Sequence, residues 1–219
     1  LKKTFPEAIR ISWEEVEDIL WELFVAMRKS GYSPDVVIGV ARGGLAPARI
    51  LADYLKNKYV CTFQMGHWGD GKNLSDKPKI VFPLPEVDLS HREVLVVDDV
   101  SDEGGTMEEV VNYLRDKVGG IRTAVVIDKD ITRFKPDFCG RVLKEWGWIL
   151  FPWSKHEDLL SFTEKVLQLT GGVTIEDIVR ILEESLSVEI VTSEIEKVIL
   201  DMKLAGEVTE DENKVWSLI

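Results

Sequence analysis

The segment from Val94 to Met107 reads "VLVVDDVSDEGGTM". Its four leading apolar residues fit a strand that is buried on both faces, because no polar residues alternate with them. An acidic loop with two adjacent glycines follows, and apolar residues then recur at helical spacing from about Thr106 to Lys117. This succession of buried strand, glycine-bearing loop and helix is typical of an α/β protein.

The same succession occurs earlier in the chain. Residues 34–55 read "PDVVIGVARGGLAPARILADYL", in which an apolar strand at residues 36–40 meets a loop at residues 42–44 and continues as a helix. "IRTAVVID" at residues 121–128 is a third apolar strand. Continuous apolar strands that alternate with helices predict a doubly wound, mainly parallel sheet, with ligands outside the carboxyl ends of its strands.

Other elements flank these strands. Ser12 with Glu15 resembles a capping box and predicts a first helix that ends near Gly31. Residues 59–65 and 79–82 are expected to be strands. The polar, glycine-bearing stretch between them predicts a mobile loop or hairpin tip.

Composition and charge exclude several classes of protein. The chain has 219 residues, 45% of them hydrophobic, and no apolar run approaches the roughly 18 residues of a membrane span. The net charge of -12 argues against nucleic acid and anionic membrane as partners. Cys61 and Cys139 form no CxxC pair and accompany no secretory signal, so we expect a cytoplasmic protein. His67, His91 and His156 are isolated and lack the spacing of metal ligands.

The composition changes after Gly172. Thr174, with Asp177 three residues later, predicts a helix start, and a second apolar-faced helix and a hairpin follow. These elements resemble a reduced winged helix. Residues 171–219 hold four Lys or Arg against twelve Asp or Glu, however, and the resulting charge of -8 would repel a phosphate backbone. We therefore expect a main domain at residues 1–170 and a small α+β appendage whose apolar helix faces need burial and promote self-association.

The loop after residue 97 has the chemistry to bind a phosphate and a sugar. A glycine-rich turn at a helix N-terminus leaves N–H groups unpaired, and the helix dipole there also favours an anion. Gly104 and Gly105 allow close approach, and Thr106 can add a hydroxyl donor. Ionised Asp98 and Asp99 only accept, so beside a phosphate they would bind hydroxyls or a cation. The loop therefore indicates a ribose 5-phosphate, with the alternative that its carboxylates merely cap the helix.

The two loops resemble motifs of one family. "VLVVDDVSDEGGTM" resembles the phosphoribosyl pyrophosphate (PRPP) signature of type I phosphoribosyltransferases, and "VVIGVARGGLAPARIL" resembles their pyrophosphate-binding loop. "IDKDITRFKPDF" and "WGWILFPW" resemble the base-binding end of archaeal and bacterial purine enzymes of this family. The resemblance covers about residues 12–156 and implies the type I phosphoribosyltransferase fold for the main domain.

This resemblance also implies roles for the matching residues. Asp98 and Asp99 match the pair that binds the ribose hydroxyls and, through the substrate, a metal. Asp102 matches the residue that handles the N7 proton of a 6-oxopurine, and Lys129 the lysine that donates to its 6-oxo group. The other matches are the 5-phosphate loop (Asp102, Glu103, Gly104, Gly105, Thr106), the pyrophosphate contacts (Ala41, Arg42, Gly43) and two base contacts, Trp148 by stacking and Ile149 by its backbone.

Three departures from the family pattern stand out. Glu103 occupies a position where threonine is usual, and a carboxylate beside a phosphate dianion is unfavourable unless it points away. The ending "GGTM" is similar to adenine-specific members, which usually lack an acid at the position of Asp102. The segment between the two outer strands also lacks the Ser-Tyr pair of many 6-oxopurine enzymes.

The resemblance implies a purine phosphoribosyltransferase of nucleotide salvage. It would join a purine base to PRPP with Mg²⁺ and release pyrophosphate and a nucleoside 5'-monophosphate, with Asp102 as the catalytic base or acceptor. Hypoxanthine or guanine is favoured over adenine because Lys129 can only donate. Adenine remains the alternative if Asp128 or Asp130 diverts that lysine. A PRPP-sensing transcription regulator is the alternative of another class, and a homodimer or higher homo-oligomer is expected.

Overall fold

A computed structural model describes residues 4–66, 78–131 and 133–219. The chain divides into two compact units. The sheet unit is Trp13–Glu145, and the helical unit combines Leu1–Ser12 with Trp146–Ile219. Most of the predicted mobile loop, including His67, lies outside the described residues.

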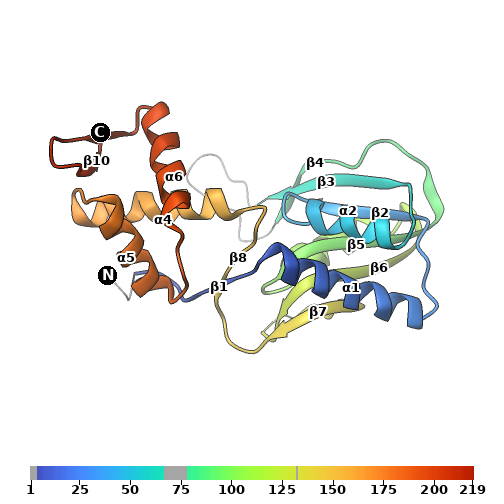
Figure 1. Cartoon of the computed structure of the whole chain (residues 1–219). Coiled ribbons are helices and arrows are strands. Elements are labelled where there is room, and N and C mark those ends of the chain that lie inside the picture. The colour runs from blue at the N-terminus through green and yellow to red at the C-terminus, as the bar shows by residue number, and fades with distance from the viewer. Residues whose placement is uncertain (1–3, 67–77, 132) are drawn as a thin grey trace. The chain divides into compact units, whose positions relative to one another are not determined.

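A six-stranded sheet of order β4-β3-β2-β5-β6-β7 forms the middle of the sheet unit (Figure 1). Edge strand β4 pairs antiparallel with β3, whereas the four other adjacent pairs are parallel. The prediction of a mainly parallel sheet is therefore confirmed. The strands are β2 (Val36–Ala41), β3 (Val60–Gly66), β4 (Lys79–Phe82), β5 (Leu89–Ser101), β6 (Val118–Lys129) and β7 (Phe138–Leu143).

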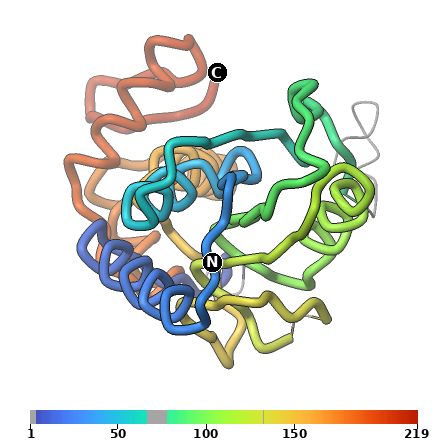
Figure 2. The backbone as a smooth tube through the Cα atoms, turned by 90° about the vertical axis from the view of Figure 1, so that its right-hand side faces the viewer, coloured from blue at the N-terminus to red at the C-terminus, as the bar shows by residue number. Residues whose placement is uncertain are grey.

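Helices cover both faces of this sheet. Figure 2 shows α1 (Trp13–Lys29) and α2 (Leu45–Tyr54) on one side and α3 (Gly105–Leu114) on the other. Val94 and Val96 of β5 share a buried cluster with residues of α3, while Leu95 and Val97 are equally inaccessible to solvent. Because both faces are covered, the strands are apolar without alternation.

Helix α1 illustrates how the sequence pattern produces a buried helix. Its buried residues recur every three or four positions and so lie on one face of the helix. Its first turn is acidic and its last turn basic, which complements the helix dipole. The buried residues are Val16, Ile19, Leu20, Leu23 and Met27.

The sequence located most elements of the sheet unit to within a few residues. It placed the end of α3 near Lys117, but the helix ends at Leu114 and a turn closed by Lys117 N–H and Leu114 O leads into β6. It missed β7, whose segment "FCGRVL" mixes glycine and arginine with apolar residues. That mixture is typical of an edge strand, which is only partly buried.

The helical unit contains three helices and two short pairs of strands. Strand β1 (Ala8–Arg10) pairs parallel with β8 (Trp148–Leu150), and β9 (Val208–Glu210) pairs antiparallel with β10 (Trp216–Leu218). The predicted start of α5 is confirmed, since the Thr174 hydroxyl accepts the Asp177 N–H at 3.2 Å. The sequence missed β1, β8 and α4. The helices are α4 (Lys155–Thr170), α5 (Ile175–Leu186) and α6 (Thr192–Leu204).

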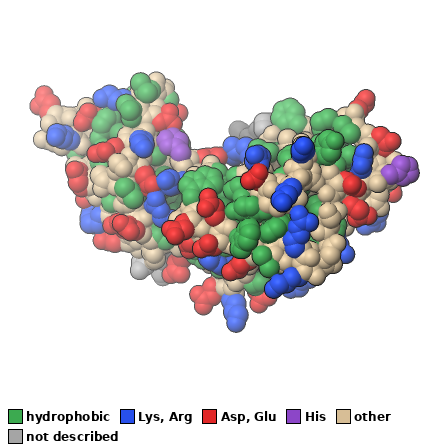
Figure 3. Space-filling view, turned by 45° about the vertical axis from the view of Figure 1, so that its right-hand side comes forward, with side chains coloured by type: hydrophobic (Ala, Val, Ile, Leu, Met, Phe, Trp, Pro, Cys, Tyr) green, Lys and Arg blue, Asp and Glu red, His purple; other side chains and the backbone are tan. Residues whose placement is uncertain are grey.

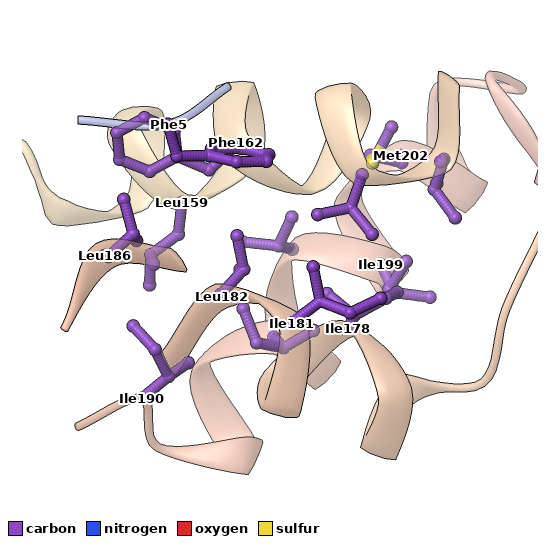
Figure 4. Close-up of a cluster of buried hydrophobic side chains, with 14 of the residues drawn as sticks. Phe5, Leu159, Phe162, Ile178, Ile181, Leu182, Leu186, Ile190, Ile199 and Met202 are labelled. Atoms are coloured by element: carbon purple, nitrogen blue, oxygen red, sulfur yellow. The ribbon is translucent and has the colours of Figure 1, made fainter. Parts of the chain in front are cut away.

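One hydrophobic cluster joins all three helices of this unit to the start of the chain (Figure 4). Phe5 lies beside Phe162 of α4, with ring centroids 6.0 Å apart, and Leu182 of α5 and Val198 of α6 are fully buried in the same cluster. The apolar faces of α5 and α6 are thus buried within the chain. Burial of these faces therefore does not require a second copy of the chain, and self-association of the tail stays a prediction.

The compact units do not coincide with the predicted boundary at residue 170. Helix α4, assigned to the main domain by the prediction, shares its core with residues 171–219. The functional division into residues 1–170 and 171–219 stays a prediction, as does the winged-helix resemblance of the tail.

Two further expectations from the sequence concern the negative charge of the surface and the absence of a membrane-spanning segment. Figure 3 shows acidic side chains spread over the visible surface, and Asp and Glu outnumber Lys and Arg in the chain by 39 to 27. Within the ranges that the structure describes, no helix combines the length and the apolar character needed to cross a bilayer.

Candidate active site

The predicted pyrophosphate loop lies at the carboxyl end of β2. The peptide bond between Ala41 and Arg42 is cis, and Gly43 and Gly44 then lead into α2. The Gly44 N–H donates to Val40 O at 2.8 Å, so the loop turns back onto the strand that it leaves. The N-cap residue of α2 is Gly44, which has no side chain to cap the helix. In the first turn the Leu45 N–H donates to Arg42 O at 3.2 Å and Pro47 has no N–H, so this helix end offers few N–H groups to an anion.

Glycine brings this loop into contact with the acidic loop of the neighbouring strand. A Cβ at Gly43 would lie 2.0 Å from the Asp99 carboxylate, closer than side-chain atoms can approach. A Cβ at Gly44 would lie 2.3 Å from the Val97 carbonyl oxygen. The two motifs that are about fifty residues apart in the sequence therefore form one site, and its assembly requires glycine at both positions.

Asp98 and Asp99 occupy the carboxyl end of β5, next to β2. Asp98 is 8% exposed, and its Oδ1 accepts the Asp99 N–H at 3.0 Å. Burial, followed by the charge of Asp99, raises the pKa of Asp98 well above its usual range. Two adjacent carboxyl groups with one held in a dry site are ready to accept from hydroxyl groups or to share a cation.

The predicted 5-phosphate loop continues from these aspartates into α3. Gly104 has a φ of 84°, a left-handed conformation that suits glycine, and α3 begins at Gly105. The cap position itself is Gly104, which has no side chain, and the alternative that the carboxylates of the loop cap the helix stays a prediction. Thr106 lies half-buried in the first turn, while the Glu103 side chain is exposed and its carbonyl accepts the Arg133 N–H at 3.3 Å.

Lys129 and Asp102 form the closest ion pair of the site. The Lys129 ammonium lies 2.6 Å from Asp102 Oδ1, with the lysine side chain 5% exposed and the aspartate side chain 51% exposed. The pair joins the end of β6 to the loop after β5. The Lys129 ammonium thus pairs with Asp102, and the alternative that Asp128 or Asp130 diverts this lysine from the base stays a prediction.

The two remaining base-binding candidates belong to the helical unit. Trp148 is 41% exposed, donates from its indole Nε1 to Asp158 at 3.1 Å and contacts Phe162 edge to face. Ile149 is buried in β8. The structure brings the phosphate, ribose and lysine candidates together in the sheet unit, and the roles of Trp148 and Ile149 in base binding stay predictions.

The acidic residues provide an incomplete metal site. No group of three or more His, Cys, Asp or Glu side chains with metal-binding geometry occurs in the described part of the chain. Asp98 and Asp99 could supply two carboxylates, whereas Mg²⁺ prefers six oxygen ligands. A magnesium ion here would need substrate oxygens and water to complete its shell, which fits an ion that arrives with a pyrophosphate ester.

One supporting contact was not identified from the sequence. The Ser101 hydroxyl donates to the Asp128 carboxyl group, and both residues are 4% exposed. Ser101 and Asp128 are direct partners in the register of β5 and β6. The signal in the sequence was a polar residue next to each of the two candidate residues Asp102 and Lys129.

Together these groups offer acceptors for sugar hydroxyls between the glycine loop after β2 and the N-terminus of α3, with a buried ammonium at the end of the next strand. Such an arrangement suits a phosphorylated sugar that carries a second phosphate group. Ser101, whose hydroxyl meets the Asp128 carboxyl group, is 4% exposed and so is not open to attack a substrate. The chemistry of the site therefore rests on positioning and charge.

Comparisons with known proteins agree with this chemistry. Residues 8–158 match the family model of the phosphoribosyl transferase domain. A hypoxanthine-guanine phosphoribosyltransferase of Aquifex aeolicus is 35% identical over 51% of this chain and 67% of its own length. A xanthine-guanine phosphoribosyltransferase of Ruegeria is 31% identical over 67% of this chain and 85% of its own length.

A regulator also occurs among the relatives. The transcriptional regulator GfcR of Methanothrix thermoacetophila is 38% identical over 43% of this chain and 46% of its own length. The similarity covers less than half of either protein, so it extends to a shared part and not to the whole regulator.

Solved structures give the same fold. A purine phosphoribosyltransferase from Pyrococcus horikoshii superposes with a TM-score of 0.59 at 33% identity, covering 67% of this chain and 93% of that one. With the family model matched over most of the sheet unit and both phosphate loops inside the match, the chain belongs to the phosphoribosyltransferases, the transferases of pentosyl groups, and its relatives include purine phosphoribosyltransferases of bacteria and archaea.

Proposed function

We propose that the protein is a 6-oxopurine phosphoribosyltransferase of nucleotide salvage. It would join hypoxanthine, guanine or xanthine to PRPP and release pyrophosphate and a nucleoside 5'-monophosphate. The observation that carries this proposal is the pair of Lys129 and Asp102, whose atoms lie 2.6 Å apart at the ends of adjacent strands, beside the Asp98 and Asp99 loop. The names of the relatives support the same substrate class.

PRPP would occupy the ends of β2 and β5. Asp98 and Asp99 would accept from the ribose hydroxyls, and the amides from Gly104 to Thr106 would bind the 5-phosphate at the N-terminus of α3. The pyrophosphate group would lie against Ala41, Arg42 and Gly43. Mg²⁺ would enter bound to PRPP and neutralise the charge of the leaving group, with the two aspartates contributing to its shell directly or through the sugar.

Lys129 and Asp102 would then recognise the purine base by hydrogen bonding. A lysine ammonium has only donors, so it complements a 6-oxo group and opposes the 6-amino group of adenine. Asp102 would accept the ring proton of the purine, a role that suits a carboxylate on the solvent-accessible side of the pair. In the free protein the two side chains satisfy each other, so neither charge is left unpaired before the base arrives.

The reaction requires little from the protein beyond placement and charge. The bond from C1 of the ribose to the pyrophosphate oxygen would break as the purine nitrogen forms its bond to C1. Positive charge develops on the sugar between these events, and the nearby carboxylates stabilise it. The proton that the purine loses passes to Asp102 or to water.

A competition assay tests the proposal. Adenine, hypoxanthine, guanine and xanthine are supplied together with PRPP and Mg²⁺ at limiting enzyme, and the products are separated by chromatography. We expect the monophosphates of the 6-oxopurines to dominate. A clear preference for adenine would contradict the role of Lys129.

A matched pair of variants makes this test specific. Lys129→Ala should lower kcat/KM for hypoxanthine and guanine by about tenfold or more while changing adenine use far less, because one charged hydrogen bond is lost. Lys144→Ala removes an exposed lysine of the same unit and should change neither. Equal losses for all four bases in Lys129→Ala would point to a structural role instead.

A second candidate function is a PRPP-sensing transcription regulator. The similarity to GfcR over 43% of this chain favours it, and a helical tail with a hairpin is present. The charge of -8 on residues 171–219 opposes it, because DNA would be repelled. Binding of PRPP together with a DNA shift and no nucleotide product would favour the regulator over the enzyme.

A further inference from the structure

Two consecutive residues at the end of β6 contact the place where β5 ends. Asp128 accepts from the hydroxyl of Ser101, the last residue of β5, and the Lys129 ammonium lies 2.6 Å from the carboxylate of Asp102, the residue that follows β5. Asp128 and Lys129 are successive residues of β6, so their side chains lie on opposite faces of that strand. The chain at Ser101 and Asp102 is thus held to β6 by side chains from both faces of β6.

The Asp128 contact is buried and polar, and burying a carboxyl group costs free energy unless hydrogen bonds compensate it. Asp128 and Ser101 are each 4% exposed, and Asp128 Oδ1 has no hydrogen-bond partner among the described residues. Burial raises the pKa of Asp128, the nearby Asp130 raises it further, and the charge of Lys135 and the hydrogen bond from Ser101 lower it. An apolar residue would avoid this desolvation but could not hold the Ser101 hydroxyl.

We propose that Asp128 is a positioning residue: through Ser101 it fixes the strand end that carries Asp102, while Lys129 fixes Asp102 itself from the other face. The inference rests on the proposed function only in giving Asp102 a role at the base. The two contacts together form a two-sided clamp, which consists of Ser101, Asp102, Asp128 and Lys129. The clamp fixes the position of the Asp102 carboxylate before substrate binds.

The clamp makes a different prediction for each replacement of Asp128. Asparagine keeps an oxygen that accepts the Ser101 hydroxyl, and its amide group has nearly the shape of the carboxyl group. Alanine offers Ser101 no acceptor at this position. The Ser101 hydroxyl needs a hydrogen-bond acceptor at residue 128 and not a negative charge. Asp128→Asn should therefore preserve the contact with Ser101, and Asp128→Ala should remove it.

Kinetics with hypoxanthine at saturating PRPP test this. Asp128→Ala and Ser101→Ala should each lower kcat/KM for the base by about tenfold to a hundredfold, the loss typical of a misplaced reacting group. Asp128→Asn should stay within about twofold of the parent protein, and the double variant Ser101→Ala/Asp128→Ala should lose no more than either single one. The PRPP dissociation constant, measured by calorimetry, should change far less than the base kinetics.

Thr123→Ala is the matched control. Thr123 is buried in the same strand and its hydroxyl contacts Asp137 at 3.0 Å, away from the clamp. It should leave the base kinetics unchanged. Parent-like activity of Asp128→Ala, a loss in Asp128→Asn as large as in Asp128→Ala, an equal loss of PRPP affinity, or an equal loss in Thr123→Ala would each overturn the proposal.

Amide hydrogen exchange separates failure of the clamp from failure of the proposed function. If the parent protein converts no purine, the function proposal fails, and exchange at residues 101–104 still decides the clamp. Asp128→Ala and Ser101→Ala should speed exchange there, and Asp128→Asn should not. Unchanged exchange in folded Asp128→Ala would overturn the clamp, and if that variant does not fold, Ser101→Ala decides by the same criterion.

Discussion

Asp98 is a residue at which stability and binding oppose each other. It is nearly buried at a strand end, beside the charge of Asp99, and these surroundings disfavour its ionised form. A ribose that donates hydroxyl hydrogen bonds, or a cation, would relieve that cost. The surroundings of Asp98 therefore favour ligand binding at the expense of the stability of the free protein.

Asp98→Asn should accordingly stabilise the free protein. A raised folded pKa for an acid means that its burial costs nothing below the unfolded pKa of about 3.9 and a growing amount as pH rises through the folded pKa. Asparagine carries no charge, so Asp98→Asn avoids the free-energy cost of ionising a buried carboxyl group. Its melting temperature should exceed that of the parent by roughly 2–4 °C at pH 8, as about 1 kcal/mol produces in a chain of this size.

The pH dependence of that gain is the sharper measurement. Scanning calorimetry at pH 8 and pH 4 should show the difference between variant and parent shrinking toward the lower pH. The affinity of Asp98→Asn for PRPP with Mg²⁺ should fall at the same time. A gain that is equal at both pH values would mean that Asp98 is not ionised at a cost in the folded protein.

At the scale of elements, the glycine loop between β2 and α2 determines whether the two phosphate motifs can meet. In Gly43→Ala the added Cβ would displace the Asp99 carboxylate, a mobile side-chain end, so the fold should survive. PRPP affinity should drop by about tenfold or more, because the displaced group no longer faces the ribose. Calorimetric titration with PRPP and Mg²⁺ measures the loss.

Gly44→Ala serves as the contrasting variant. Its Cβ would meet backbone oxygens of Val97 and Val40 at 2.3 and 2.7 Å, which cannot move without shifting two strands. It should lower the melting temperature far more than Gly43→Ala does. This role of the glycine loop would be contradicted by a Gly43→Ala variant that binds PRPP as the parent does, or by one that unfolds as readily as Gly44→Ala.

A second junction of elements lies in the helical unit, where Glu194 of α6 contacts two cations. Arg10 beside β8 donates to both carboxylate oxygens at 2.7 and 3.0 Å, and Lys155 of α4 donates at 2.5 Å. Burial raises the pKa of Glu194, but the hydrogen bonds and charges of Arg10 and Lys155 together outweigh it, and the pKa lies below its usual value. Glu194→Gln should cost about 1.5–3 kcal/mol at pH 7.

Because the pKa of Glu194 is lowered in the folded protein, the stability that this residue contributes depends on pH. A depressed folded pKa gives stability that is present above the unfolded pKa of about 4.3 and is lost as pH falls through the folded pKa. The difference between Glu194→Gln and the parent in urea unfolding should therefore shrink below about pH 4. Glu184→Gln, which removes an exposed carboxylate 3.7 Å from Arg180, should cost less than about 0.5 kcal/mol at any pH.

At the scale of the whole molecule, α4 shares its hydrophobic core with residues 171–219. Removal of these residues therefore tests the stability of α4 as well as self-association. Removing residues 171–219 would expose Val166 and Leu167 of α4, which are almost fully buried against that tail. Each such side chain contributes about 1.5–3 kcal/mol when buried. The truncated chain should aggregate or bind a hydrophobic dye, and circular dichroism should show loss of α4.

Light scattering on the intact chain is needed beside this experiment. The homodimer or higher oligomer stays a prediction, and it no longer has the support of unburied faces on α5 and α6. A truncated chain that stays folded, with α4 intact and no dye binding, would show that the tail is a separate appendage after all.

The sequence by itself determined the local features of this protein. Apolar runs identified β2, β5 and β6, glycine and acidic residues identified the loops that follow them, and the Thr174 cap identified the start of α5. These signals are local because strand burial, turn conformation and helix capping depend on neighbouring residues. The loop motifs also carried the family resemblance, which the matches confirm.

Only the tertiary structure decided which residues meet. The sequence did not indicate that Asp102 pairs with Lys129, that Asp128 holds Ser101, or that Gly43 lies against Asp99. Nor did it indicate that the apolar faces of α5 and α6 pack against α4, because an apolar helix face shows that burial is needed and not against what. Each of these contacts depends on strand order and register, which bring distant segments together, and no local pattern of residues contains that information.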